Sequence, residues 1–89
     1  MDPEALLGRT SAEGLAPPLE ALWWDACGDW DRAHQVAQSV DTPDGAWVHA
    51  YLHRKEGDLS NADYWYRRAG RARPSTPLDA EWAEIARAL

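Results

Sequence analysis

The sequence predicts an all-α protein made of two helical hairpins and a C-terminal helix that caps them. Apolar residues recur at the three- and four-residue spacing of a helix face, and glycine, aspartate and proline breaks separate the segments that contain them. No run of strand-type alternation interrupts this pattern. The chain of 89 residues has room for one small domain, so a large enclosed active site is not expected.

The first segment, residues 1–16, is expected to be a loosely ordered arm or a short helix. Asp2 is a suitable N-cap, Pro3 suits the first helical position, and Gly8 suits the end of such a helix. The stretch RTSAEGLAPP that follows has the composition of a linker. We therefore expect a single all-α domain over residues 17–89.

A tight helical hairpin is predicted to begin at Pro17. Gly28 is expected to end its first helix in a left-handed conformation, and Asp29 to cap its second helix. The single cysteine, Cys27, is interpreted as a small core residue and not as a reactive thiol. The predicted core positions are Leu19, Leu22, Trp23, Ala26 and Cys27 in the first helix and Ala33, Val36, Ala37 and Val40 in the second.

A second hairpin is predicted over residues 43–56 and 59–73. Thr42 is the expected N-cap of its first helix, and Gly57 followed by Asp58 repeats the stop and start of the first hairpin. The core positions of its second helix are Ala62, Trp65, Tyr66 and Ala69.

The C-terminal helix is predicted over residues 77–89. Thr76 and Asp79 have the spacing of a capping box, with Pro77 at the first helical position. Its apolar stripe consists of Leu78, Trp82, Ile85 and Leu89.

The two hairpin corners form an internal repeat. The sequences CGDWDRAHQVA at 27–37 and EGDLSNADYWY at 56–66 share glycine, aspartate, a bulky apolar residue and alanine at a period of 29 residues. Residues 17–74 thereby resemble the tetratricopeptide family and its Sel-like relatives; the run from 49 to 70 also looks similar to stretches of short bacterial proteins. The matching residues of the second unit are Ala50, Gly57, Asp58, Leu59, Ala62, Tyr66, Ala69 and Pro74.

The resemblance implies a small interaction or adaptor module that binds a peptide or protein partner through the third and fourth helices. Two such units are few for independent folding, so a homo-oligomer is also plausible, as is a self-assembling structural protein. In the repeat register, aromatic and cationic side chains of the third helix would line a concave groove suited to an acidic peptide. The alternative is that this helix is covered on more than one side. The partner-binding candidates are Trp47, Tyr51, Arg54, Lys55 and Arg67.

Two histidines stand where the repeat usually has large apolar residues. His49, His53 and Glu56 lie at i, i+4 and i+7, on one face of the third helix. Three interpretations remain open: histidines hydrogen-bonded between packed helices, a face that binds a partner or small ligand, and a metal or acid-base site. No established catalytic motif is present, so an enzyme is not favoured, and no cofactor is expected.

The charge distribution limits the class of partner. The net charge of −6 argues against general nucleic-acid binding, because phosphate binding needs a cationic face. Residues 54–73 nevertheless carry six bases and three acids, a local basic patch. The sequence contains neither a signal peptide nor an apolar run of membrane-spanning length, so a cytoplasmic protein without membrane contact is expected.

Overall fold

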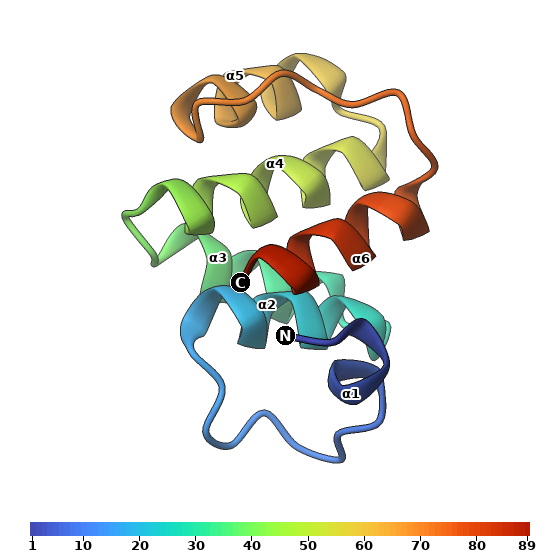
Figure 1. The fold of residues 1–89 in the computed structure, drawn as a ribbon. Coiled ribbons are helices and arrows are strands. Elements are labelled where there is room, and N and C mark those ends of the chain that lie inside the picture. Colours follow the sequence, from blue (N-terminus) through green and yellow to red (C-terminus); the bar gives the residue numbers. More distant parts are fainter.

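A computed structural model describes residues 1–89 and contains six helices and no strand. Figure 1 shows α5 at one end of the molecule, α4 next to it, and α2 and α1 toward the opposite end. The all-α prediction is therefore confirmed. The helices are α1 (Pro3–Leu7), α2 (Pro17–Ala26), α3 (Trp30–Gln38), α4 (Pro43–Glu56), α5 (Leu59–Arg68) and α6 (Leu78–Ala88).

The contacts between helices are consistent with two hairpins, α2 with α3 and α4 with α5. The last helix, α6, returns to pack on α4, α2 and α1. It brings the two ends of the chain together, because the Met1 ammonium donates to the carbonyl of Ala86 at 2.6 Å. No helix of the chain is both long and apolar enough to cross a membrane.

Left-handed glycines end three of the helices in the same way. At each corner the residue after the glycine donates to a carbonyl of the last helical turn: Asp29 to Trp24, Asp58 to His53 and Arg71 to Tyr66. The aspartates that follow Gly28 and Gly57 then cap α3 and α5 through their side chains. These two corners were predicted correctly.

The third corner corrects the predicted length of α5. We expected this helix to reach Arg73, but it ends at Arg68 because Gly70 adopts a φ of 74°. The predicted capping box of α6 is also wrong. The N-cap of α6 is Pro77 and no side chain caps the helix; the Asp79 carboxylate accepts from the amide of Ala80 instead of serving the cap.

The buried face of α2 differs from the prediction at its C-terminal end. Ala26 and Cys27 are exposed, so Cys27 is not a core residue. Ala21 and Asp25 are buried in their place. The polar residue Asp25 thus lies on the inner side of the last turn of α2, where the apolar pattern predicted Ala26.

Helix α4 lies at the centre of the molecule. Nine consecutive residues, Gly45 to His53, are buried, because α2, α3, α5 and α6 all contact this helix. Of the two alternatives for the third helix, coverage on more than one side is therefore the one observed. The start of α4 sits tightly on the preceding loop, where a Cβ at Gly45 would lie 2.5 Å from the carbonyl oxygen of Val40.

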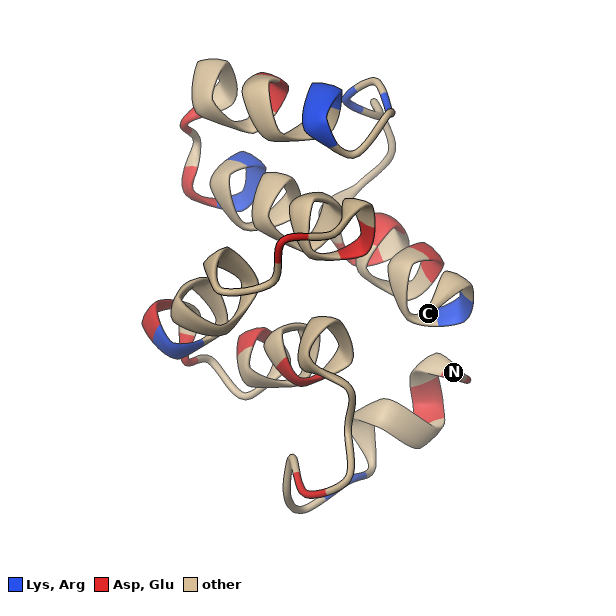
Figure 2. Ribbon diagram, turned by 90° about the vertical axis from the view of Figure 1, so that its left-hand side faces the viewer, with Lys and Arg blue, Asp and Glu red and all other residues tan.

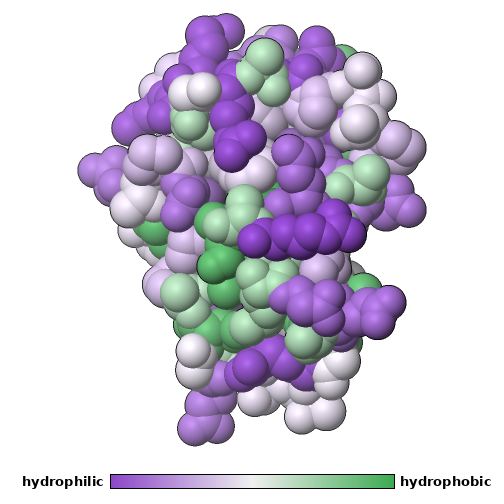
Figure 3. Space-filling view, viewed as in Figure 1, coloured by the Kyte–Doolittle hydropathy of each residue, from purple (hydrophilic) through white to green (hydrophobic).

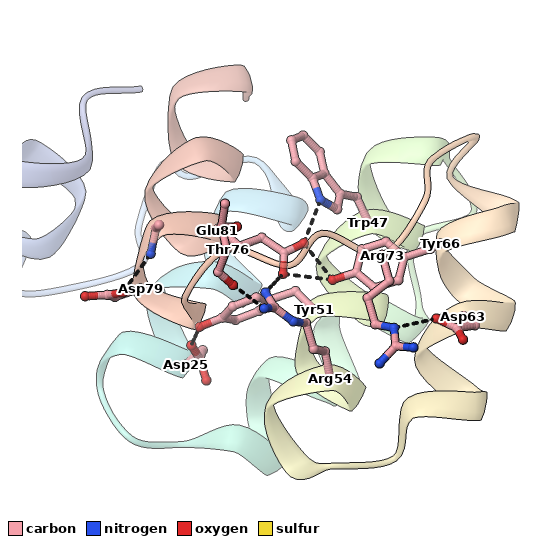
Figure 4. A network of polar contacts seen from close by, with 11 residues as sticks. Asp25, Trp47, Tyr51, Arg54, Asp63, Tyr66, Arg73, Thr76, Asp79 and Glu81 are labelled. Carbon is pink, nitrogen blue, oxygen red and sulfur yellow. Dashed lines mark hydrogen bonds and ion pairs between the residues drawn. The ribbon is translucent and has the colours of Figure 1, made fainter.

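A buried carboxylate ties α6 to this centre. Glu81 has no solvent exposure and accepts hydrogen bonds from the hydroxyl of Tyr66 at 2.6 and 2.8 Å, from Arg54 Nη1 at 2.8 Å and from Trp47 Nε1 at 3.3 Å. Figure 4 shows these three side chains converging on Glu81 from α4 and α5. The two oxygens therefore have several donors, which offsets the cost of burying the charge.

Candidate metal centre

All three histidines of the chain meet between α3, α4 and α5. His34 lies one residue after the buried Ala33 on the inner side of α3, and His49 and His53 are successive turns of α4. One ring nitrogen from each histidine lies within 4.8 Å of the others. His49 and His53 are buried, with exposures of 4% and 6%, whereas His34 is partly exposed.

The contact between His34 and His49 has the geometry of a shared ligand position. Their Nε2 atoms lie 3.0 Å apart. Two imidazole nitrogens bound to one tetrahedral zinc ion, each at 2.0 to 2.1 Å, are separated by about 3.3 Å. A small adjustment of either ring would therefore let both nitrogens bind one ion.

His53 carries a supporting carboxylate. Its Nδ1 lies 2.7 Å from Glu56 Oε1, one helical turn away on α4. A carboxylate that accepts from Nδ1 fixes the imidazole tautomer and leaves Nε2 free as a ligand. Glu56 is thus placed to orient a ligand instead of serving as one.

Tryptophan rings enclose the cluster on two sides. Trp30 stacks on His34 with ring centroids 5.0 Å apart, and Trp65 stacks on His49 with centroids 4.0 Å apart. The indole of Trp30 is itself held by a 2.9 Å hydrogen bond from Nε1 to the carbonyl of Leu52. These contacts restrict rotation of both imidazole rings.

One atom of the cluster has no hydrogen-bond partner. His49 Nδ1 is buried and is the only buried side-chain nitrogen or oxygen without one. Such groups cost free energy and are uncommon in native structures. This atom is the second ring nitrogen, not the Nε2 that faces His34.

The electrostatics around His34 and His49 favour neutral imidazole. Burial, followed by the charges of His34, His53 and Arg68, lowers the pKa of His49 to about 4. Burial and the charge of His53 also lower the pKa of His34. Both rings are therefore unprotonated at neutral pH, the form in which imidazole binds metal ions.

The predicted metal candidates are brought together only in part. His49 and His53 belong to the cluster, but Glu56 contacts His53 from outside it. His34 was missed, although its i+4 relation to Trp30 and its place after Ala33 put it on the inner face of α3. The polar partners of the buried histidines are another histidine, for His49, and Glu56, for His53.

A second group of potential ligands, His53, Glu56 and Asp58, lies beside the first. Asp58 is engaged as the N-cap of α5, where it accepts from the amide of Asn61. Only His53 and Glu56 of this second group therefore remain as potential metal ligands.

The partner-binding candidates lie in different environments. Trp47 and Tyr51 are buried, with exposures of 4% and 2%. The Arg54 guanidinium is paired with buried Glu81, and Lys55 is paired with Asp25 at 2.9 Å while remaining half-exposed. Arg67 is exposed at the surface.

Positive charge is concentrated around α5, as Figure 2 shows. Arg68 lies over the ring of Trp65 at 4.9 Å, and Arg71 lies over the ring of Trp47 at 3.3 Å. Two of the predicted core rings of this region differ in burial: Tyr66 is 1% exposed, whereas Trp65 is only partly buried.

Comparison with known proteins gives no match to this chain, whether with family models, with curated proteins or with solved structures.

Proposed function

We propose that the protein binds a divalent transition-metal ion of the zinc type through His34, His49 and His53. The observation that carries the proposal is the convergence of one nitrogen from each ring within 4.8 Å. Three imidazoles suit zinc, copper, nickel and cobalt, and do not suit magnesium or calcium, which prefer oxygen ligands.

The surroundings support the same ligand chemistry. Glu56 stands in the position of an outer-shell carboxylate behind His53, and the stacked tryptophans keep the rings oriented. Three nitrogen ligands leave a tetrahedral ion one position for water or for a ligand from solution. Partly exposed His34 marks the side from which the ion enters.

The test is zinc binding to protein that carries no histidine tag. Cys27 is exposed, so a Cys27→Ser background removes a competing thiol ligand. After metal removal with EDTA and exchange into chelator-free buffer, calorimetry should show one zinc ion per chain. At a free zinc concentration 100 times Kd, the metal should raise the free energy of unfolding by about 2.7 kcal/mol.

Matched variants identify the ligands. His34→Ala removes a ligand, and Gln35→Ala changes the exposed neighbour on the same helix without touching the cluster. Zinc binding should be lost in the first variant and kept in the second, and Glu56→Gln should weaken it about 10- to 100-fold. The proposal fails if zinc at 1 mM leaves the melting temperature of the parent unchanged, or if His34→Ala binds as tightly as Gln35→Ala.

A second candidate function is recognition of an acidic protein or peptide by the surface of α5, within a tetratricopeptide-like arrangement of the two hairpins. It is favoured by Arg67, which is exposed and has no carboxylate within ion-pair distance. A fluorescent glutamate-rich peptide should bind the parent and lose affinity in Arg67→Ser. Binding that Arg67→Ser leaves unchanged would reject this role for α5.

A further inference from the structure

A cleft of about 460 Å³ lies away from the histidines, where α1, α2, α4 and α6 meet. This volume falls within the range of small-molecule sites. Six apolar residues line it: Pro3, Leu7, Ala26, Leu78, Trp82 and Ala83. Leu7 is 58% exposed, so the cleft presents an apolar side chain that the protein itself does not cover. Figure 3 shows hydrophobic residues gathered on the part of the surface where α1, α2 and α6 lie.

The polar end of the cleft is built around a buried carboxylate. The Asp25 side chain is 3% exposed and accepts from Lys55 Nζ at 2.9 Å and from the hydroxyl of Tyr51 at 3.2 Å. Each carboxylate oxygen retains capacity for a further donor, because an ionised carboxylate accepts about four hydrogen bonds. Asp79, an exposed acid in the first turn of α6, lies on the same lining.

The charges of this lining favour a cation. Asp25 and Asp79 outnumber Lys55, whose charge is already matched by Asp25. Asp25 and Lys55 belong to the last turns of α2 and α4, whose dipoles end negative here, whereas Asp79 lies at the positive end of α6. An anion would meet two carboxylates, whereas an ammonium group would gain hydrogen bonds from them.

We propose that the cleft binds a small organic amine, with its apolar body against Leu7, Trp82 and Ala83 and its ammonium group at Asp25 and Asp79. The hydroxyl of Tyr51 and the ammonium of Lys55 hold Asp25 in place for this contact. The site shares no residue with the histidine cluster and does not depend on it.

The experiment compares three probes of similar shape in the presence of EDTA: tryptamine, 3-ethylindole and indole-3-propionate. Titrations followed by two-dimensional amide NMR should place tryptamine at Leu7, Lys55 and Ala83, with affinity highest for tryptamine and lowest for the propionate. Asp79→Asn should weaken tryptamine binding at least about threefold, since one nearby charge is lost. Glu84→Gln, an exposed acid of α6 outside the cleft, should leave binding unchanged.

A second variant fills the cleft. Ala83→Trp should abolish binding of tryptamine while circular dichroism shows the parent helix content; should this variant unfold, Asp79→Asn and Glu84→Gln decide alone. The proposal is overturned if indole-3-propionate binds as tightly as tryptamine, if shifts fall outside the cleft, or if Asp79→Asn and Glu84→Gln have equal effects.

Discussion

Helix α4 carries two buried polar clusters of opposite character. Trp47 and Arg54 meet Glu81 on one side, where every buried polar atom has a partner. His49 and His53 face the other side, where one buried nitrogen has none. At 100° per residue the two sets are centred about 130° apart around the helix. Both clusters are enclosed to a similar degree, so burial alone does not distinguish them.

This difference in hydrogen bonding indicates that the Glu81 network has a structural role and the histidine cluster a binding role. A network in which all donors and acceptors are paired needs nothing further and mainly fixes how α6 docks. A cluster of neutral nitrogen ligands held by stacked rings gains free energy when an ion binds to them. The comparison therefore predicts that damage to the first cluster costs stability, whereas damage to the second costs binding.

The largest effect is expected for Glu81→Ala. This change leaves the Arg54 guanidinium, the Tyr66 hydroxyl and the Trp47 indole N–H without their common acceptor. Removing one partner of a buried ion pair typically costs 3 to 5 kcal/mol, so we expect about that loss of unfolding free energy in urea titrations. Glu84→Ala, an exposed change on the same helix, should cost less than about 0.5 kcal/mol. A loss below 1 kcal/mol for Glu81→Ala would show that the network is dispensable.

A smaller effect is expected from acidification of the metal-free protein. The pKa of His49 is about 4 in the folded chain against 6.5 when unperturbed, so the unfolded chain binds more protons between these values. Stability should therefore be intact above pH 6.5 and fall as the pH decreases toward 4, by about 3 kcal/mol in total. Urea titrations in EDTA across this range measure the loss. A flat profile would contradict the buried neutral state of His49.

The smallest effect is expected for His49→Phe at pH 7.5. The ring stack on Trp65 is kept and the unpaired Nδ1 is removed, so the unfolding free energy should change by less than about 1.5 kcal/mol. The same variant should lose zinc binding and lose most of the acid sensitivity described above. A loss as large as that of Glu81→Ala would mean that the histidine cluster is a structural network as well.

The helix boundaries were predictable where their determinants are neighbours in the sequence. Gly28 with Asp29 and Gly57 with Asp58 supply a left-handed stop and an N-cap within two residues, and the chain follows both. Gly70 has the same conformation but is followed by arginine, a good helix former, and by no cap. Arginine and alanine favour a helix on both sides of Gly70, but the left-handed turn at this glycine ends α5.

The clusters were harder to predict because their members are distant in the sequence. Glu81 lies one position before Trp82 and three after Leu78, on the buried side of α6, but its donors come from residues 15 to 34 positions away. His34 and His49 are 15 residues apart and on different helices. The residue spacing within α4 identifies only His49 and His53, the pair at i and i+4. Tertiary packing places α3 opposite this pair, and the local sequence pattern carries no information about that packing.

The position of α4 has a consequence for how the chain opens. In a linear array of repeats, each unit contacts only its neighbours and can separate from one end. Here α4 contacts α2, α3, α5 and α6, so neither hairpin can detach without uncovering it. Amide hydrogens in the middle of α4 should therefore exchange with solvent at the rate set by global unfolding, and those of α1 much faster. We therefore expect the two hairpins, which have similar corners, to unfold as a single cooperative unit.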